Sequence, residues 1–283
     1  TAIAAALIIG GAYTTLRIFT CPVWRDAQLT VQQAVNYPEI PCIDPDGATL
    51  GTRILPPEGF TRTPSPEGSF AEYIRRYPML PNGSDMPIFD GSTRKGILSA
   101  GVFDISLPTT GYQQCADSII RLYSDYFRQS GQEDRLSYHF TNGCLCDWAS
   151  WQKGTRILAC GSFSCRLPVT LPDSGDQQYR NYLLEVMRYA GTLSMQKESE
   201  PITAGELRIG DIICNDEHVV LIADEVVSES GERCFLIGQG FIPSVCFHIV
   251  NGIGDDGSPW YTEKELSGET MKISGRTFRQ EDI

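Results

Sequence analysis

Apolar residues recur at helical spacing immediately after Cys115. The recurring positions are Ile119, Leu122, Tyr123 and Tyr126. Residues three and four apart share one face of a helix, so this pattern predicts an amphipathic helix with one buried side. Gly111 closes the preceding loop, and the helix is therefore expected to begin close to Cys115.

Other segments extend the pattern into a mixed domain. A second long helix is predicted over 177–190, and Ser69 is expected to cap a short helix. Apolar, β-branched runs predict strands over 97–107, 135–141, 155–160, 211–214, 218–227, 234–241 and 245–250. Strands and helices in this order favour one α+β domain over residues 67–283, with the Cys115 helix packed on an antiparallel sheet.

The first 66 residues follow a different pattern. Ala2 to Tyr13 is a run of small and apolar residues, typical of a signal peptide or a short membrane anchor over residues 1–20. Cys21 follows a faint lipobox pattern and is a candidate lipidation site. Residues 21–66 are rich in Pro and Gly, which predicts an extended arm or linker.

Charge and histidine content narrow the function classes. The net charge is −12 and no basic stripe is present, so nucleic acid is not expected to bind. The three histidines lack ligand spacing, and we predict neither a metal nor another cofactor. Contact with a membrane is expected only through the N-terminal segment.

Ten cysteines favour an oxidising compartment. Their spacing is not that of common zinc sites, and we predict disulfides within one cluster of four. The cluster consists of Cys144, Cys146, Cys160 and Cys165.

Cys115 is the candidate nucleophile. Unpaired backbone N–H groups and the helix dipole at a helix N-terminus favour a thiolate, the nucleophilic form of cysteine. Asp117 opposes this, because a nearby carboxylate raises the pKa of a thiol. Two other roles stay open for Cys115, a disulfide partner and an inert buried thiol.

His218 opens an apolar strand about a hundred residues later and is the candidate general base. If Val226 pairs with Arg233 across the turn, Gln239 lies opposite Val220, on the same face as His218. The Gln239 oxygen is then expected to accept Nδ1–H of His218 and leave Nε2 free to deprotonate the thiol. The alternative for Gln239 is a buried glutamine that bonds the backbone.

Gln113 and Gln114 precede the cysteine. Either could donate a side-chain N–H to an oxyanion beside the backbone N–H of Cys115. The alternative is that they cap the loop. Asp224 lies six positions after His218, which is about 20 Å along a strand, so Asp224 is not expected to orient the imidazole.

The histidine segment resembles a known group of enzymes. Residues 210–213 (Gly-Asp-Ile-Ile) followed by 218–222 (His-Val-Val-Leu-Ile) resemble the histidine segment of papain-fold peptidases and amidases of the NlpC/P60 and CHAP kind. This resemblance implies a papain-like fold in which the histidine activates a helix-cap cysteine. Glu217 stands where those families usually have Gly.

A longer resemblance covers most of the chain. Matching pieces lie at residues 54–60, 68–75, 113–122, 140–143, 189–194, 238–243 and 259–261. Together they resemble a family of exported or lipoprotein-like bacterial proteins, domain-of-unknown-function family 4846. Cys144 and Cys146 depart from its pattern, and the resemblance implies export but supplies no activity.

The leading hypothesis is therefore an exported cysteine hydrolase of the bacterial cell envelope. It would act on an amide bond in a peptide or peptidoglycan-like substrate through Cys115, His218 and Gln239. A non-catalytic envelope protein that binds a peptide or glycan is the alternative. A third class is a disulfide-stabilised structural lipoprotein.

Overall fold

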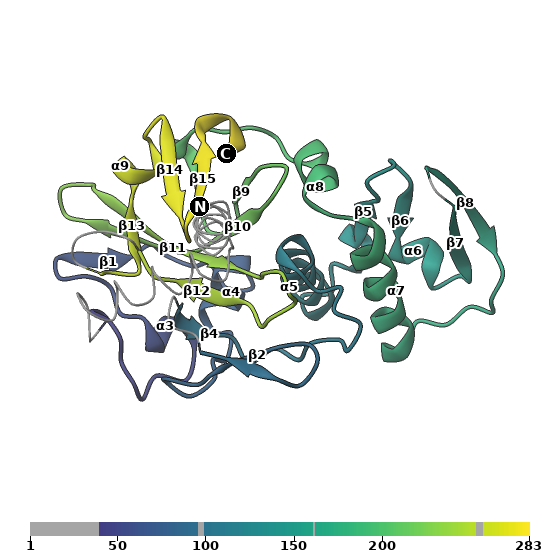
Figure 1. Ribbon diagram of the computed structural model, residues 1–283, viewed down its shortest axis with the longest axis horizontal. Helices are drawn as coiled ribbons and strands as arrows, with labels where there is room; N and C mark the ends of the chain where they lie inside the picture. Colours follow the sequence, from purple (N-terminus) through teal and green to yellow (C-terminus); the bar gives the residue numbers. More distant parts are fainter. Residues whose placement is uncertain (1–39, 96–98, 161, 253–256) are drawn as a thin grey trace, which may run out of the picture.

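The computed structural model describes residues 40–95, 99–160, 162–252 and 257–283 (Figure 1). It is a mixed α/β structure whose sheets are antiparallel. In the described residues, the main sheet has seven strands in the order β1-β10-β11-β12-β4, while β9 pairs with β10 and β13 pairs with β11. Its strands are β1 (Phe60–Arg62), β4 (Ser99–Val102), β9 (Ile212–Cys214), β10 (Val219–Ser228), β11 (Arg233–Gln239), β12 (His248–Val250) and β13 (Trp260–Thr262).

The hairpin of β10 and β11 forms the centre of this sheet. Its apolar runs are buried on both faces, which is why they read as continuous rather than alternating patterns. Val227 pairs with Arg233, so the predicted pairing of Val226 with Arg233 is wrong by one residue. A β-bulge between Ile222 and Asp224 then shifts the register back, and Leu221 pairs with Gly238. Gln239 consequently lies next to Val220, where the sequence predicted it.

Helix α5 (Cys115–Gln129) packs on one face of the hairpin, as predicted. Ile119 and Leu122 are fully buried in the core between helix and sheet. A second apolar core covers the other face. It lies beneath α9 (Glu263–Leu266), the hairpin of β14 (Thr270–Ile273) and β15 (Arg276–Arg279), and the 3₁₀ turns η2 (Ala204–Glu206) and η3 (Gln280–Asp282).

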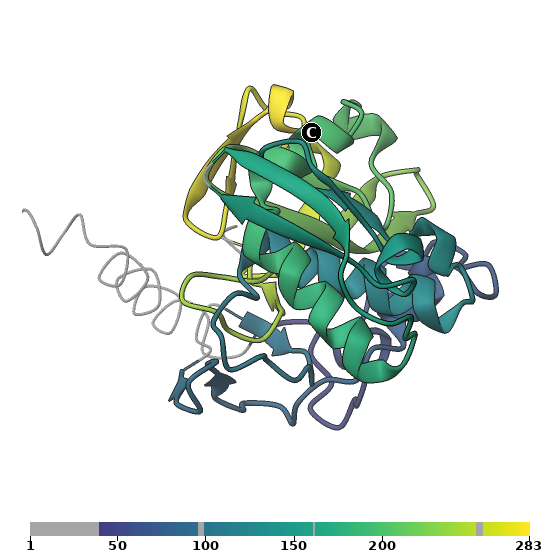
Figure 2. The same cartoon turned by 90° about the vertical axis from the view of Figure 1, so that its right-hand side faces the viewer.

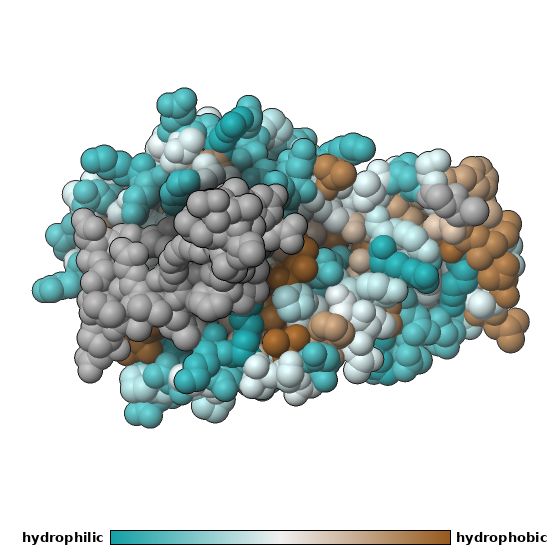
Figure 3. All heavy atoms as spheres, viewed as in Figure 1, coloured by the Kyte–Doolittle hydropathy of each residue, from teal (hydrophilic) through white to brown (hydrophobic). Residues whose placement is uncertain are grey.

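A lobe of residues 133–198 extends beyond α5 (Figures 1 and 2). It contains η1 (Glu133–Arg135), β5 (Ser137–His139), β6 (Leu145–Asp147), α6 (Trp148–Trp151), β7 (Thr155–Cys160), β8 (Phe163–Pro168), α7 (Asp176–Tyr189) and α8 (Thr192–Glu198). The predicted helix over 177–190 is confirmed as α7. The β7–β8 end of the lobe is apolar at its surface (Figure 3), where Phe163 is 66% and Leu171 is 86% exposed.

Residues 40–66 are folded into the domain, so the predicted arm is wrong over this range. Leu50 and Ile54 are fully buried, in and just after α3 (Leu50–Arg53), and β1 pairs with β10. The rest of this side consists of α4 (Phe70–Arg75), β2 (Met86–Pro87) and β3 (Thr93–Arg94). The signal peptide or anchor over 1–20, and residues 21–39 of the arm, lie outside the described residues.

Asp224 holds this N-terminal part to the sheet through two ion pairs. Its two carboxylate oxygens lie 2.7 Å from Nε of Arg62 and 2.7 Å from Nε of Arg75, and the side chain is fully buried. Arg75 also donates to the backbone oxygen of Thr63 at 2.6 Å. Because both oxygens of this buried carboxylate pair with guanidinium groups, Asp224 is not available to orient His218, in agreement with the sequence prediction.

Candidate functional site

Cys115 is the first residue of α5, and its thiol is free and 6% exposed. A disulfide role for Cys115 is therefore absent from this structure. Backbone N–H groups of Cys115 itself, Ala116 and Val219 lie near the sulfur and lower the pKa of the thiol. Two of them belong to the helix N-terminus, and the third belongs to the residue that follows His218.

Burial is the largest influence on the thiol and raises its pKa. The N–H of Ala116 lowers the pKa, and the charge of Asp117 raises it again. Burial also raises the pKa of Asp117, to about 7, although its Oδ2 accepts the N–H of Gln114 at 3.0 Å. The net direction for Cys115 is upward, so the thiol is protonated at neutral pH.

His218 and Gln239 are in direct contact. Nε2 of His218 lies 2.7 Å from Oε1 of Gln239, and both side chains are buried. The predicted partnership is confirmed, but the predicted ring nitrogen is wrong: Gln239 takes Nε2 rather than Nδ1. Nδ1 makes no hydrogen bond to any described residue, so it is the ring nitrogen that is free to accept a proton.

Two further side chains fix the orientation of the Gln239 amide. Its Nε2 lies 3.1 Å from Nε2 of His248 and 2.8 Å from Oγ of Ser274. Nδ1 of His248 lies 3.1 Å from the backbone oxygen of Cys246, which can only accept, so Nδ1 carries the proton and Nε2 accepts. Gln239 therefore donates to His248 and Ser274 and accepts Nε2–H from His218. Burial lowers the pKa of both His218 and His248 to about 4, so both rings are neutral at pH 7.

The Cys115 thiol lies near the backbone that follows His218. The backbone N–H of Val219 lowers the pKa of the thiol, but no hydrogen bond joins the sulfur to the His218 ring in the described part of the chain. The ring instead lies 6.0 Å from the ring of Phe241 and 6.4 Å from that of Phe278, centroid to centroid. The structure thus assembles the His–Gln half of the predicted group and places Cys115, at the start of α5, near Val219, the residue that follows His218.

Buried polar groups surround the N-terminus of α5. Gln113 is fully buried, and neither Oε1 nor Nε2 of its side chain has a partner. The same is true of Oγ of Ser118, which the sequence analysis did not single out. Gln114 instead caps the loop, because its side chain reaches the backbone oxygen of Gly111 at 3.5 Å. Of the two predicted oxyanion donors, Gln113 is the one with an unused N–H.

Gly240 allows the end of β11 to approach the N-terminus of α5 closely. A Cβ at position 240 would overlap Oγ of Ser118 and would lie 2.5 Å from the backbone oxygen of Gln114. The end of β11 therefore passes directly against the first turn of α5, which brings Gln239 and Cys115 to the same end of the sheet.

The predicted disulfide cluster is not formed by the cysteines described. Cys144, Cys146 and Cys165 are free thiols. Cys146 is buried against α7 on the β5–β6 hairpin, whereas Cys165 lies opposite Leu158 on the separate β7–β8 hairpin. The side chain of Cys160 and all of Cys21 lie outside the described residues.

The remaining ligand-type residues form no metal centre. Within the described ranges, no group of three or more His, Cys, Asp or Glu side chains could hold a metal ion. His139 is paired with Glu198 on the lobe surface, with 2.6 Å between Nδ1 and Oε1. No described helix combines the length and the apolar character needed to cross a bilayer.

Comparison with known proteins gives one family match. A family model described as a domain of unknown function (4846) matches residues 50–283. No curated protein and no solved structure matches the chain. The match begins at α3, which agrees with the inclusion of residues 50–66 in the folded domain.

Proposed function

This chain belongs to the domain-of-unknown-function family 4846, and we propose that it is a cysteine hydrolase that cleaves an amide bond. The observation that carries the proposal is the His218–Gln239 hydrogen bond of 2.7 Å, in an arrangement that leaves Nδ1 of His218 unprotonated. His218 is also the residue whose chain neighbour, Val219, has a backbone N–H that lowers the pKa of the Cys115 thiol. A nucleophile, a base and a group that orients the base are the parts such a reaction needs.

The chemistry follows from these positions. On attack, the thiol proton moves to Nδ1 of His218 while the sulfur forms a bond to the carbonyl carbon of the substrate. The imidazolium then returns this proton to the leaving nitrogen as the C–N bond breaks, which leaves a thioester on Cys115. Water attacks the thioester, gives a proton to Nδ1 and releases the carboxylic acid, and the sulfur takes the proton back.

The resting protonation states suit general-base catalysis. The thiol is protonated because burial raises its pKa, and His218 is neutral because burial lowers its pKa to about 4. In the free protein no thiolate–imidazolium pair exists, and the substrate must bring the two groups into reach. Catalytic hydrogen bonds are often completed only in the substrate complex.

The oxyanion would be held by groups already present at the helix N-terminus. The backbone N–H groups of Cys115 and Ala116 lie near the reacting sulfur, and the Gln113 amide is buried with an unused N–H. Donors of this kind, fixed in place before the reaction, stabilise charge that develops on the carbonyl oxygen.

A cell-wall peptide in the bacterial envelope is the substrate we propose. The feature that supports an envelope location is the apolar run from Ala2 to Tyr13. The cysteine count gives it less support than the sequence suggested, because Cys144, Cys146 and Cys165 are free thiols. In a papain-like arrangement, the substrate would approach the end of the sheet at which α5 begins.

A peptide- or glycan-binding protein without catalysis is the second candidate. It is favoured by the burial of the Cys115 thiol and by the unpartnered side chains of Gln113 and Ser118, which a bound ligand could satisfy. In that case, Cys115 would never form a covalent intermediate.

Acylation by p-nitrophenyl acetate, followed by intact-protein and peptide mass spectrometry, separates these two functions. We expect one acetyl group on Cys115 in the wild type. In the His218→Gln variant, which keeps a donor for Gln239 but lacks a base, acylation should be about 100-fold slower or slower still. Gln239→Ala should slow acylation less, since the base remains but its orientation is lost.

His139→Gln is the matched control, because His139 is an exposed histidine on the lobe. Its acylation rate should equal that of the wild type, and circular dichroism should confirm that all variants are folded. A Cys115 that is never acylated, or acylated equally fast in His218→Gln, would refute the hydrolase and leave the binding function.

A further inference from the structure

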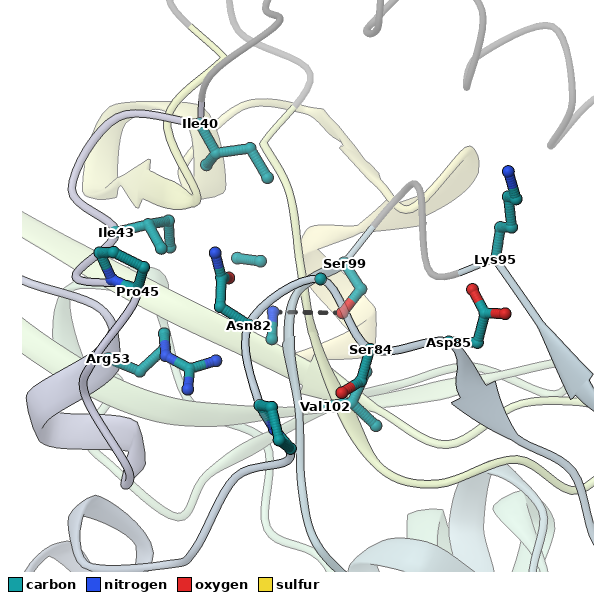
Figure 4. A pocket seen from close by; sticks show the side chains of 14 residues that line it. Ile40, Ile43, Pro45, Arg53, Asn82, Ser84, Asp85, Lys95, Ser99 and Val102 are labelled. Carbon is teal, nitrogen blue, oxygen red and sulfur yellow. Dashed lines mark hydrogen bonds between the residues drawn. The ribbon is translucent and has the colours of Figure 1, made fainter.

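A cavity of about 740 Å³ lies beside β4, on the far side of the sheet order from β1. Its volume falls in the range of small-molecule sites. Figure 4 shows its polar side chains, which are Arg53, Asn82, Ser84, Asp85, Lys95 and Ser99. Ile40, Ile43 and Val102 supply apolar wall. None of these residues belongs to the Cys115 site.

Arg53 is the unusual member of this lining. The residue is only 3% exposed, yet its guanidinium makes no ion pair with any described carboxylate. Nη1 donates to the backbone oxygen of Leu80 at 3.2 Å, and Nε is buried without a partner. Burial lowers the pKa of Arg53, and the charge of Asp44 offsets this only in part. A buried cation without a paired anion is costly, which points to an anion that binds there.

The two ends of the cavity differ in charge. In Figure 4 the guanidinium of Arg53 extends toward Asn82 at one end, while Asp85 and Lys95 lie at the other. Asp85 and Lys95 are exposed and carry opposite charges, so they add no net charge to that end. Ser99 uses its Oγ to accept the N–H of Gly101 at 3.2 Å, which fixes the hydroxyl between the ends.

We propose that this cavity binds the carboxylate of a peptide C-terminus. Arg53 would receive the carboxylate through its unused N–H groups, with Asn82 as a second donor, and the apolar wall would contact the terminal side chains. The opposite end, where the charges of Asp85 and Lys95 offset each other, offers no net positive charge for a second anionic group. A sugar acid presents the same carboxylate, but it has no apolar side chains for the wall of Ile40, Ile43 and Val102.

A purely structural role for Arg53 makes a different prediction. Arg53 is the last residue of α3, where a cation stabilises the helix C-terminus, and its bond to Leu80 ties α3 to the neighbouring loop. Such a role affects folding stability, but it gives no discrimination between a carboxylate and an amide.

Calorimetric titration tests the proposal with N-acetyl-alanyl-alanine, its C-terminal amide and glucuronate as three ligands. We expect the dipeptide acid to bind at least tenfold more tightly than the amide, and more tightly than glucuronate. Arg53→Met should remove the preference for the acid, and Arg53→Lys should retain part of it. Asn82→Ala, at an exposed position, should weaken acid binding without a folding defect.

Arg76→Met is the matched control, since Arg76 is an exposed arginine outside the cavity. Equal binding of acid and amide, or no binding of either, would overturn the proposal. Binding of glucuronate alone would overturn the assignment to a peptide. Cys115→Ala should bind the acid as the wild type does, so loss of hydrolase activity and loss of this cavity's function are measured separately.

Discussion

Asp117 acts on Cys115 from two residues further along the same helix turn. Its charge raises the pKa of the thiol, and its own pKa of about 7 means that it is half ionised near neutral pH. One carboxylate oxygen caps the backbone N–H of Gln114, and the other is buried without a partner. The reactivity of Cys115 should therefore depend on the ionisation of Asp117.

The variant Asp117→Asn keeps an oxygen that can accept the N–H of Gln114 but removes the charge. We expect the pKa of Cys115 to fall, so that iodoacetamide labels Cys115 about threefold to tenfold faster at pH 8. Labelling is measured by peptide mass spectrometry, with Asp134→Asn as the control at an exposed acid outside α5. An unchanged rate at Cys115 would show that Asp117 does not control the thiol.

The sequence predicted individual residues better than their hydrogen bonds. The contact between His218 and Gln239 follows from strand alternation and pairing, which depend on local spacing. The orientation of the Gln239 amide, and with it the protonated nitrogen of His218, is set by His248 on β12 and Ser274 in the turn after β14. No periodicity in the sequence connects these residues, so the sequence could not assign the tautomer.

At the scale of elements, the site depends on the contact between the end of β11 and the first turn of α5. Gly240 permits this contact because a side chain there would overlap Ser118 and Gln114. Strain at position 240 can be relieved only if the helix N-terminus or the strand end moves. Cys115 would then move relative to the His218–Gln239 pair.

Gly240→Ala should therefore lower the acylation rate of Cys115 about 100-fold, since a displacement of about 1 Å has an effect of that size. It should also lower the free energy of unfolding in urea by about 1–3 kcal/mol. The control is Gly191→Ala, where a Cβ would meet no atom within 4 Å. Wild-type acylation in Gly240→Ala would mean that this contact does not position the nucleophile.

Elements that rest on local patterns were predicted well, and those that rest on distant partners were not. Helices α5 and α7 and the hairpin of β10 and β11 appear near their predicted ranges, because their apolar periodicity is strong. Strand β1 was predicted as part of a linker, since its three residues are ordered by pairing with β10 more than 160 positions away. Its anchoring through Asp224 with Arg62 and Arg75 is equally non-local.

In the molecule as a whole, the main sheet separates two apolar cores. The hydrogen-bonded side chains of His218, Gln239 and His248 are enclosed at one end of this sheet. Enclosure explains why both histidines are neutral. It also couples the stability of the fold to pH, because protonation of Nε2 of His248 would remove the acceptor of the Gln239 N–H. Protonation of Nδ1 of His218 would place a charge in buried surroundings.

The direction in which stability changes with pH follows from the histidine pKa values in the folded and unfolded protein. In the unfolded chain a histidine titrates near pH 6.5, whereas in the folded protein burial lowers the pKa of His218 and of His248 to about 4. Between these values the unfolded chain binds more protons, so stability rises with pH. The contribution is complete above pH 6.5 and is lost as the pH falls toward 4. Asp117 has the opposite sign, because its pKa is raised to about 7.

Replacement of one histidine isolates this effect. His248→Asn retains a donor for the backbone oxygen of Cys246 and cannot be protonated, so it should lose less stability than the wild type between pH 7.5 and pH 4.5. We expect the difference in that loss to be about 2–3 kcal/mol, measured by urea unfolding at the two pH values. The contribution of Asp117 is common to both proteins and cancels in this comparison. If wild type and His248→Asn lose equal stability on acidification, His248 is not a buried neutral base, and the orientation of Gln239 must be set by Ser274 alone.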